Sequence, residues 1–332
     1  MTTICTQSCI VLGIATLLAL PPSAPASSQE SDWPAHYVRM VVPGGSATAA
    51  DLAARLIATH LAEPWKQQVV VENRPGAGGM AGTAQIARAT PDGYSLLFAQ
   101  GAPLSLSPHT FESVPYDVER DLAPVVFVGM VPLVLAASPK LQVTTTTDLI
   151  AIARKNPGKL TFATSSARSI PHLAADYLMR AANIEMVQVP YVGYPQAIQD
   201  TVTGTVDALF GGAQVITQSE GGNLRMLGVS TPTRLPNHDG IPTIGETVPA
   251  FEGVAGWLAV MAPKGVPATI IARMNADIRR ILDRAEVRAR LHDLGIYPDT
   301  VKLGDPQALA AFIRRDTALM HQIVKAAGLK PE

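Results

Sequence analysis

The chain alternates between short, apolar, β-rich runs and segments with the spacing of amphipathic helices. In its first third, the runs 37–43 (YVRMVVP), 67–73 (QQVVVEN) and 94–100 (YSLLFAQ) are separated by helical patterns at 51–61 and 80–88. Such alternation predicts βαβ units, in which helices cover a parallel sheet. The runs are mostly apolar throughout, as strands with both faces buried require. We therefore expect an α/β fold.

A second series of the same kind follows between residues 132 and 230 and is long enough to form its own sheet. The chain then has one more strand pattern, at 253–265, and two amphipathic helices, at 267–283 and 306–327. Because no new strands accompany these helices, we expect them to pack back on the first sheet. Two crossings between two sheets make a hinged cleft. The sequence thus predicts a discontinuous domain 1 and a continuous domain 2, with the limits 33–131 plus 252–332 and 132–251.

The first 26 residues have the pattern of a secretion signal. An apolar run of eleven residues, Ile10 to Leu20, precedes Ala24-Pro25-Ala26, which fits a small-x-small cleavage site, although the usual positive charge before the run is missing. Eleven residues are too few to span a bilayer. Both cysteines lie in this segment, so cleavage leaves a mature chain without thiol chemistry or disulfides. We expect a soluble periplasmic protein; the alternative is a buried N-terminal helix.

The charges exclude several classes of partner. The chain has 26 Lys and Arg against 27 Asp and Glu, so no net field attracts nucleic acid or an anionic membrane surface.

The chain has no G-x-S-x-G or S-x-x-K pattern, and none of its histidines is paired at the spacing of helical metal ligands. We therefore expect no catalytic residues, no metal and no cofactor.

A glycine-rich stretch, Val69 to Gly82 (VVVENRPGAGGMAG), stands between a strand and a helix. Glycine permits close approach of the backbone and positive φ, and a helix start offers free N–H groups to an anion. Gly76, Gly78 and Ala81 also match the dinucleotide fingerprint G-x-G-x-x-A. That interpretation is disfavoured because the motif opens on Arg-Pro and no acid follows at a strand end. Contact with a ligand and a purely structural turn both remain open.

With these motifs in hand, the chain resembles the substrate-binding receptors of tripartite tricarboxylate transporters, the Bug family of periplasmic proteins. The resemblance extends from Tyr37 to Gly328. It is carried, in order, by VVVENRPGAGGMAG, TPDGYSLLF, PYDVERDLAPV, NPGKLTFATS, VPYVGYPQAIQDTVTGTVDALF, GWLAVMAPKGVP and IVKAAGLKPE. It implies a two-domain type II periplasmic binding protein of the Venus flytrap kind, which closes by hinge bending on a small carboxylate.

The first loop implied to hold the ligand departs from the family pattern. Relatives have a loop like VPFPPGGGTD, whereas this chain reads VPGGSATAAD, so the family's paired glycines fall on Ala47 and Thr48. Because both residues pay a steric penalty at positive φ, we expect a different path for this loop. Ser46, Ala47, Thr48 and Ala49 remain the predicted contacts through hydroxyl and backbone N–H groups. Alternatively, Thr48 only caps the following helix.

The opposite jaw is implied to be the loop ATSSARSIPHL, with Ser165, Ser166, Ala167 and Arg168 as contacts. Arg168 is added relative to the family pattern, and a guanidinium grips a carboxylate with two parallel hydrogen bonds. The alternative is a solvated surface arginine. His172 opens the next helix, and we interpret it as a structural residue of the helix start rather than a ligand.

Four further contacts complete the predicted site: Gly101, Ala102, Tyr191 and Gly211. Where relatives often have an Asp after the Phe of ALF, this chain has Gly211 and Gly212, which disfavours a ligand with an amino group. We therefore predict a monomeric receptor for a plain or aromatic carboxylate, serving membrane permease subunits or a sensor domain. The alternatives are a secreted hydrolase or other enzyme on the same scaffold, and a receptor that has lost binding.

Overall fold

A computed structural model of the protein describes residues 1–2, 33–164, 169–191, 194–236, 238–329 and 331. The chain divides into two units, Met1–Trp33 and Pro34–Glu332, and the fold below is that of the second unit. Apart from its first two residues, the predicted signal segment lies outside the described residues. Within the described ranges, no helix has the length and hydropathy needed to cross a membrane.

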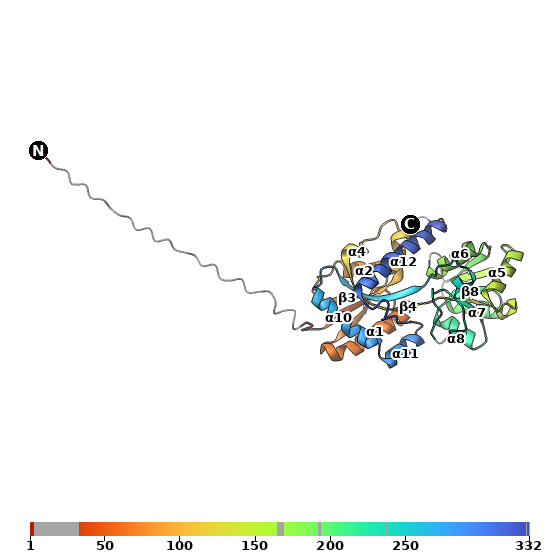
Figure 1. The fold of residues 1–332 in the computed structure, drawn as a ribbon, viewed down its shortest axis with the longest axis horizontal. Coiled ribbons are helices and arrows are strands. Elements are labelled where there is room, and N and C mark those ends of the chain that lie inside the picture. Colours follow the sequence, from red (N-terminus) through yellow and green to blue (C-terminus); the bar gives the residue numbers. More distant parts are fainter. Residues whose placement is uncertain (3–32, 165–168, 192–193, 237, 330, 332) are drawn as a thin grey trace. The chain divides into compact units, whose positions relative to one another are not determined.

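The second unit contains two five-stranded sheets, which we call the sheets of the first and second lobe (Figure 1). The first has the strand order β2-β1-β3-β10-β4. Its strands are β1 (Val38–Val42), β2 (Val69–Asn73), β3 (Ser95–Gln100), β4 (Leu122–Val131) and β10 (Gly256–Pro263). The second has the order β7-β6-β8-β5-β9. Its strands are β5 (Val134–Ala137), β6 (Thr161–Thr164), β7 (Val187–Pro190), β8 (Ala208–Gly211) and β9 (Arg225–Val229).

Each sheet is mixed, which corrects the expectation of purely parallel sheets. In the first, β10 runs antiparallel to both β3 and β4. In the second, β5 runs antiparallel to both β8 and β9. In each case the reversed strand is the first one that the chain forms after crossing from the other sheet. Such a strand does not close a βαβ unit within its own sheet, so no crossover helix makes it parallel. The predicted domain limits stay a prediction.

Helices surround both sheets. The first lobe contains α1 (Ala49–Trp65), η1 (Ala77–Gly79), α2 (Met80–Ala87), the π-helix η2 (Ala102–Leu106), α3 (Ser107–Thr110), α4 (Val118–Asp121), α10 (Ala268–Leu282) and α11 (Ala285–Asp293). The second contains η3 (Pro139–Leu141), α5 (Thr146–Lys155), α6 (Ile170–Ala182), α7 (Tyr194–Thr203), α8 (Ala213–Glu220) and α9 (Ile244–Thr247). The last helix is α12 (Pro306–Ala326).

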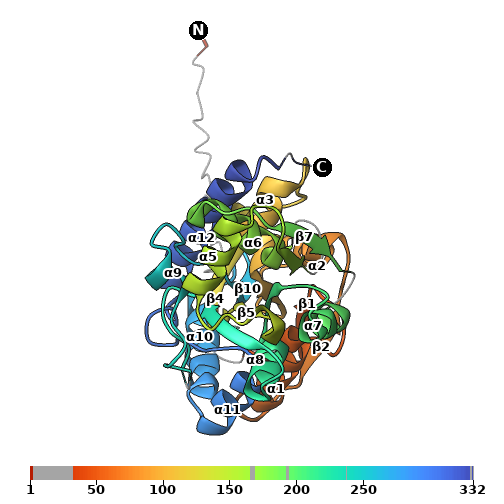
Figure 2. The ribbon, with the colours of Figure 1, turned by 90° about the vertical axis from the view of Figure 1, so that its right-hand side faces the viewer.

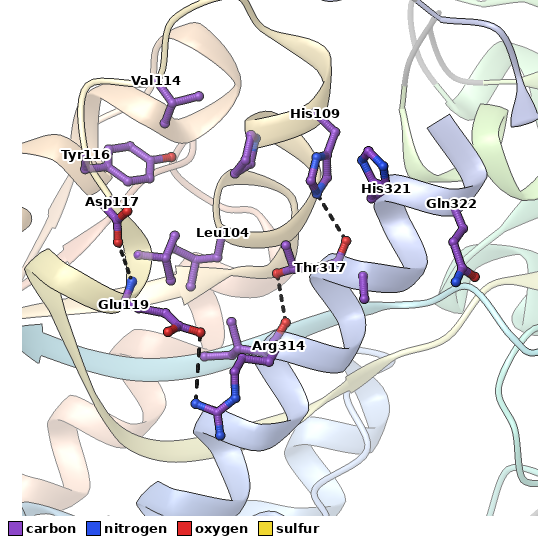
Figure 3. Close-up of a pocket in the computed structure, with 14 residues that line it drawn as sticks. Leu104, His109, Val114, Tyr116, Asp117, Glu119, Arg314, Thr317, His321 and Gln322 are labelled. Carbon is purple, nitrogen blue, oxygen red and sulfur yellow. Dashed lines mark hydrogen bonds and ion pairs between the residues drawn. The ribbon is translucent and has the colours of Figure 1, made fainter. Parts of the chain in front are cut away.

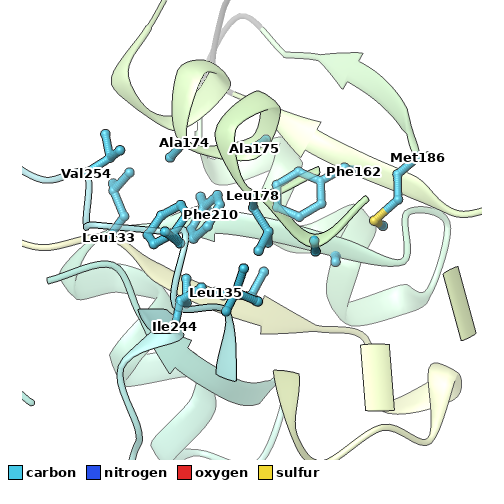
Figure 4. Packing of buried hydrophobic residues seen from close by; sticks show 14 of the residues in the cluster. Leu133, Leu135, Phe162, Ala174, Ala175, Leu178, Met186, Phe210, Ile244 and Val254 are labelled. Carbon is cyan, nitrogen blue, oxygen red and sulfur yellow. The ribbon is translucent and has the colours of Figure 1, made fainter. Parts of the chain in front are cut away.

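The core of the second lobe is aromatic at its centre. Phe162 of β6 and Phe210 of β8 pack with their ring centroids 5.5 Å apart, beneath Ala174, Ala175 and Leu178 of α6 (Figure 4). Both rings are almost fully buried. Each removes a large apolar area from water, and a tilted pair adds about 1 kcal/mol to that burial. This core fixes the two strands whose ends form the second half of the predicted site.

The last helix, α12, packs on both lobes, so the expectation that it covers only the first sheet is wrong in part. Leu309 and Ile313 belong to the core on the first sheet. Met320, Ile323 and Val324 belong to the core of the second lobe, where α12 contacts α6 (Figure 2). Since these residues follow one another at helical spacing, a single helical face joins the two cores.

Candidate functional site

The two predicted loops of the first lobe meet at one edge of its sheet. β1 and β3 are parallel neighbours, so the loops after Val42 and after Gln100 leave from adjacent positions. A Cβ on Gly44 would lie 2.9 Å from Nε2 of Gln100, which shows how closely the loops approach. Ligands of α/β proteins bind at this edge, where strands end and helices begin.

A hydrogen-bond network centred on Asp51 fixes the first loop. The carboxylate accepts hydrogen bonds from the Ala47 N–H at 2.9 Å, from Asn73 Nδ2 at 2.9 Å and from Arg55 Nε at 3.0 Å. Asn73, at the end of β2, also donates to the Gly44 carbonyl. Burial raises the pKa of Asp51, but the bonds from Arg55, Ala47 and Asn73 outweigh it, so its pKa lies below the usual value. Asp51 is 2% exposed. The loop is therefore held in place before any ligand arrives.

Thr48 is the N-cap of α1, and whether it also contacts a ligand stays a prediction. Its hydroxyl accepts from the Asp51 N–H and donates to the Gly45 carbonyl. The hydroxyl is therefore already engaged. In the part of the chain that the structure describes, the backbone N–H groups of Ser46, Thr48 and Ala49 have no hydrogen-bond acceptor. These donors stand at the positive end of the α1 dipole, and Arg55 offsets the charge of Asp51, so the loop suits an anion.

Ala47 adopts the left-handed conformation, with φ of 59°. Ala47 bears the steric penalty of positive φ, because the hydrogen bond from its N–H to Asp51 holds the backbone there. That the loop takes a different path from that of relatives stays a prediction. Thr48 is extended, with φ of −75°. The strain at Ala47 costs about 1 kcal/mol, since its Cβ approaches the following carbonyl oxygen.

Replacing Ala47→Gly should therefore stabilise the protein. We expect the free energy of unfolding to rise by about 0.5 kcal/mol, the relief of strain less the added entropy of glycine in the unfolded chain. Urea unfolding measures the change. Ala49→Gly is the matched control, because Ala49 begins a right-handed helix and its replacement should destabilise. A loss of stability in Ala47→Gly would contradict this account of the loop.

The glycine-rich segment packs against the protein itself. A Cβ on Gly79 would lie 2.7 Å from Cγ of Pro103, and a Cβ on Gly82 would lie 3.0 Å from Cα of Pro43. Gly79 also has φ of 94°. The glycines thus let the start of α2 support the loops that follow β1 and β3. At Gly79 and Gly82 the structure favours the structural turn, whereas Gly76 and Gly78 are exposed and contact with a ligand stays open there.

Gly101 and Ala102 begin the turn after β3, and Gly101 is buried against an indole. A Cβ on Gly101 would lie 2.6 Å from Nε1 of Trp257. That indole N–H donates to Oδ2 of Asp316 on α12 at 2.6 Å. No sequence pattern indicates this contact, because the three residues lie far apart along the chain. Burial raises the pKa of the Asp316 carboxyl, although the bond from Trp257 and the nearby Ser105 hydroxyl oppose the shift.

The raised pKa of Asp316 predicts a pH dependence of stability. The unfolded chain releases this proton at about pH 4, whereas the folded chain keeps it to higher pH. The folded state therefore binds more protons in this interval, and its stability falls as pH rises through the folded pKa. In Asp316→Asn, which cannot titrate, the free energy of unfolding should lack the decrease that Asp316 causes as pH rises above about 4. Urea unfolding of both proteins at a series of pH values tests it, and identical slopes would contradict it.

In the second lobe, the ends of β6, β7 and β8 form the corresponding edge. The Tyr191 N–H donates to the Thr164 carbonyl, and the Tyr191 hydroxyl donates to Oδ2 of Asp200 at 2.8 Å. Burial and the neighbouring Asp200 raise the pKa of Tyr191 to about 12. The hydroxyl proton of Tyr191 is therefore held in the hydrogen bond to Asp200. A ligand could contact the Tyr191 ring or donate a hydrogen bond to its hydroxyl oxygen. Thr164, which was not among the predicted contacts, is buried, and its hydroxyl has no partner within the described ranges.

Gly211 ends β8 and has no room for a side chain. A Cβ there would overlap Cγ2 of Val215 in α8. An Asp at this position would need α8 to move. The chain thus offers no carboxylate here for the amino group of a ligand.

The loop Ser165, Ser166, Ala167 and Arg168 lies outside the described residues. Ser169 is the N-cap of α6, and its hydroxyl accepts from the His172 N–H. The His172 ring lies 3.7 Å from the Asp176 carboxylate on the same helix. His172 therefore lies at the helix start, and that it makes no contact with a ligand stays a prediction.

A cavity of about 580 Å³ lies elsewhere, between α12 and the segment that contains α3 and α4 (Figure 3). His109 and His321 face each other at one end, with ring centroids 4.9 Å apart. Glu119 and Arg314 form an ion pair of 4.0 Å near the other end. The residues that line it include none of the predicted contacts. Among the described residues, no group of three or more His, Cys, Asp or Glu side chains is arranged to hold a metal.

Comparison with known proteins decides the family. Residues 53–329 match the model of the tripartite tricarboxylate transporter family receptor. The chain belongs to this family. The protein BugT of Bordetella pertussis is 33% identical to it over 311 residues, which cover 93% of this chain and 94% of BugT. The family and its structural neighbours are solute-binding proteins and not enzymes.

Two solved structures similar to this chain are informative because they contain ligands. Rpa4515 of R. palustris, solved with adipate, is 30% identical with a TM-score of 0.76, covering 90% of this chain and 100% of that chain. MatC from Rhodopseudomonas palustris, solved with bound malate, is 26% identical with a TM-score of 0.69, covering 88% of this chain and 100% of that chain. The two-domain fold of periplasmic binding proteins is thus shared.

Proposed function

We propose that this receptor binds a small organic carboxylate between its two lobes in the periplasm, closes by hinge bending and delivers the ligand to membrane permease subunits. The observation that carries the proposal is the set of free backbone N–H groups at Ser46, Thr48 and Ala49, held by the Asp51 network at the start of α1 in the described part of the chain. Backbone donors at a helix start bind a carboxylate without a cationic side chain.

The relatives solved with adipate and malate support a carboxylate ligand. Gly211 stands where relatives often have an Asp, and Val215 leaves no room for a side chain there. Because no carboxylate is present at this position to pair with an amino group, a ligand without an amino group is favoured. The opposite lobe supplies Thr164, whose buried hydroxyl lacks a partner among the described residues. Closure follows if the ligand contacts both lobes only in the closed form, because differential contacts shift such an equilibrium.

A thermal-shift screen of the purified mature protein tests the proposal. Adipate, malate, tricarboxylates and aromatic acids are the probes, with adipamide as the uncharged control and glutamate as the amino-acid control. A ligand at 100 times its Kd stabilises by about 2.7 kcal/mol, which gives a readily measured shift. We expect at least one carboxylate to stabilise the protein and the two controls to have no effect. Stabilisation by no carboxylate would overturn the proposal.

The same mixtures separate the receptor from an enzyme on this scaffold. A receptor leaves its ligand unchanged, so the NMR spectrum of the carboxylate after incubation should equal that before. Consumption of the compound would favour the hydrolase alternative. Co-purification with permease subunits, rather than with a sensor domain, tests the partner.

Arg168 is the one cationic side chain among the predicted contacts. We propose that its guanidinium grips the ligand carboxylate from the second lobe. Arg168→Ala should then weaken binding of the identified carboxylate by about tenfold or more, because a hydrogen-bonded charge pair is lost. Isothermal titration calorimetry measures the change, with Arg154→Ala on α5 as the control. Unchanged affinity would remove Arg168 from the site.

A further inference from the structure

An acidic residue interrupts the apolar face of α12 that joins the two lobes. The buried positions Leu309, Ile313, Met320 and Ile323 are each at most 4% exposed. Asp316 occupies the position between Ile313 and Met320 on the same face, and it is half-buried. A carboxyl within an apolar stripe is unfavourable unless a hydrogen bond compensates it.

The compensating hydrogen bond comes from the indole of Trp257. The bond from Nε1 of Trp257 to Oδ2 of Asp316 is 2.6 Å long. The indole also contacts the ring of Phe312, another α12 residue, edge-on with 5.5 Å between centroids. The ring contact and the hydrogen bond together leave one orientation for the indole, which is 2% exposed.

The backbone that follows β3 packs directly against this indole. Gly101 approaches it so closely that a Cβ would overlap Nε1 and Cδ1, at 2.6 and 2.9 Å. Gly101 has ordinary helical angles, so glycine is needed for this contact and not for the backbone conformation. The π-helix η2, whose first residue is Ala102, starts from this point and packs against α12.

We infer that Asp316 is a positioning residue of the ligand site: through Trp257 it fixes the backbone of Gly101 and Ala102. The inference rests on the proposed function, since it takes these two residues to face the carboxylate. The C-terminal part of α12 packs in the core of the second lobe. One helix therefore supports the turn after β3 and also contacts the opposite lobe.

The chain contains its own control. Trp65 of α1 donates from Nε1 to Oδ2 of Asp277 on α10 at 2.9 Å. This is the same pair of side chains, in the same lobe, but it lies at the C-terminal end of α1, about 25 Å along the helix from the ligand edge. Trp257→Phe and Trp65→Phe thus remove the same donor at different positions, whereas Asp277→Leu also removes the ion pairs of Asp277 with Arg273 and Arg280.

The test uses hydrogen exchange of the amides of Ala102–Leu106 and calorimetry with adipate as the probe. Trp257→Phe keeps a ring but loses the N–H donor, and Asp316→Leu loses the acceptor. Both should raise exchange in this segment and weaken adipate binding by about tenfold, the effect of one hydrogen bond to a charged group. Asp316→Asn keeps an acceptor oxygen and should restore both within about threefold. Trp65→Phe and Asp277→Leu should change neither.

The outcomes separate this inference from the proposed function. Exchange at the wild-type rate in Trp257→Phe and Asp316→Leu would overturn the inference, whether or not adipate binds. An equal loss in Asp316→Asn and Asp316→Leu would also overturn it, because the acceptor would then have no role. If Asp316→Leu does not fold, Trp257→Phe gives the same answer. Failure of every carboxylate to bind the wild type would instead overturn the proposed function.

Discussion

Asp51→Ala should lower the free energy of unfolding by about 3 kcal/mol and weaken carboxylate binding at least about tenfold. The change leaves the Ala47 N–H, the Asn73 amide and the Arg55 guanidinium without their acceptor. The donors are only partly buried, and the Arg55 side chain is 49% exposed, so each lost hydrogen bond costs about 1 kcal/mol, and Asp51 accepts from three groups at once. Urea unfolding and calorimetry with the best carboxylate of the screen measure the two effects.

The loss of affinity has a separate physical cause from the loss of stability. Without the carboxylate, nothing holds Ala47 at positive φ, so the free N–H groups of Ser46 and Thr48 in the described loop no longer converge. The wild-type contribution of Asp51 also depends on pH. Because its folded pKa lies below the unfolded value, the stabilisation is present above about pH 4 and is lost as pH falls.

The second lobe supplies a matched control for Asp51. Thr145 is the N-cap of α5, and Asp148 accepts from its N–H and from that of Thr144, as Asp51 accepts from Ala47. Asp148 is partly exposed and belongs to no predicted ligand contact. Because water replaces its hydrogen bonds, Asp148→Ala should cost much less stability than Asp51→Ala and leave affinity unchanged. Equal losses of affinity in both variants would show that capping in general, and not the first loop, matters.

The contrast between these two caps shows what the sequence could predict. The preference of Thr for the position before a helix is local, and it indicated capping of α1 by Thr48 as one of two alternatives, which the structure shows. Asn73 was not predicted as a partner of Asp51, because strand pairing brings β2 beside the loop and the sequence carries no sign of that register. Arg55 lies on α1 four residues after Asp51, so its i,i+4 spacing could have indicated this partner. The alternation of strands and helices was sufficient for the fold class, but not for the direction of β5 and β10.

Backbone strain and contacts between distant elements could not be predicted from the sequence. The penalty for alanine at positive φ is real, yet a hydrogen bond from its own N–H overcomes it at Ala47. The amphipathic pattern of α12 predicted a buried face. It did not show that the N-terminal turns of this face pack in the core of the first lobe and the C-terminal turns in the core of the second. The role inferred for Asp316 depends on both β10 and η2, so only the assembled fold reveals it.

Gly101→Val should weaken carboxylate binding more than any other single substitution in the site. The new Cβ would lie 2.6 Å from Nε1 of Trp257, well inside van der Waals contact, so the indole or the turn must move. Overpacking of this kind costs about 1–3 kcal/mol. If the indole moves, it loses Asp316; if the turn moves, the start of η2 shifts. We expect carboxylate affinity to fall about 100-fold, beyond the loss caused by Trp257→Phe, because the backbone itself is displaced.

A compensating change distinguishes displacement from general damage. Trp257→Leu in the Gly101→Ala background removes the ring that the Cβ meets, so this double variant should recover stability relative to Gly101→Ala alone. Gly240→Val is the control, because a Cβ on this exposed glycine meets nothing within 4 Å. It should leave both the unfolding transition and carboxylate binding unchanged. Wild-type affinity in Gly101→Val would mean that the turn after β3 does not contact the ligand, and the site would then depend on the α1 loop and the second lobe alone.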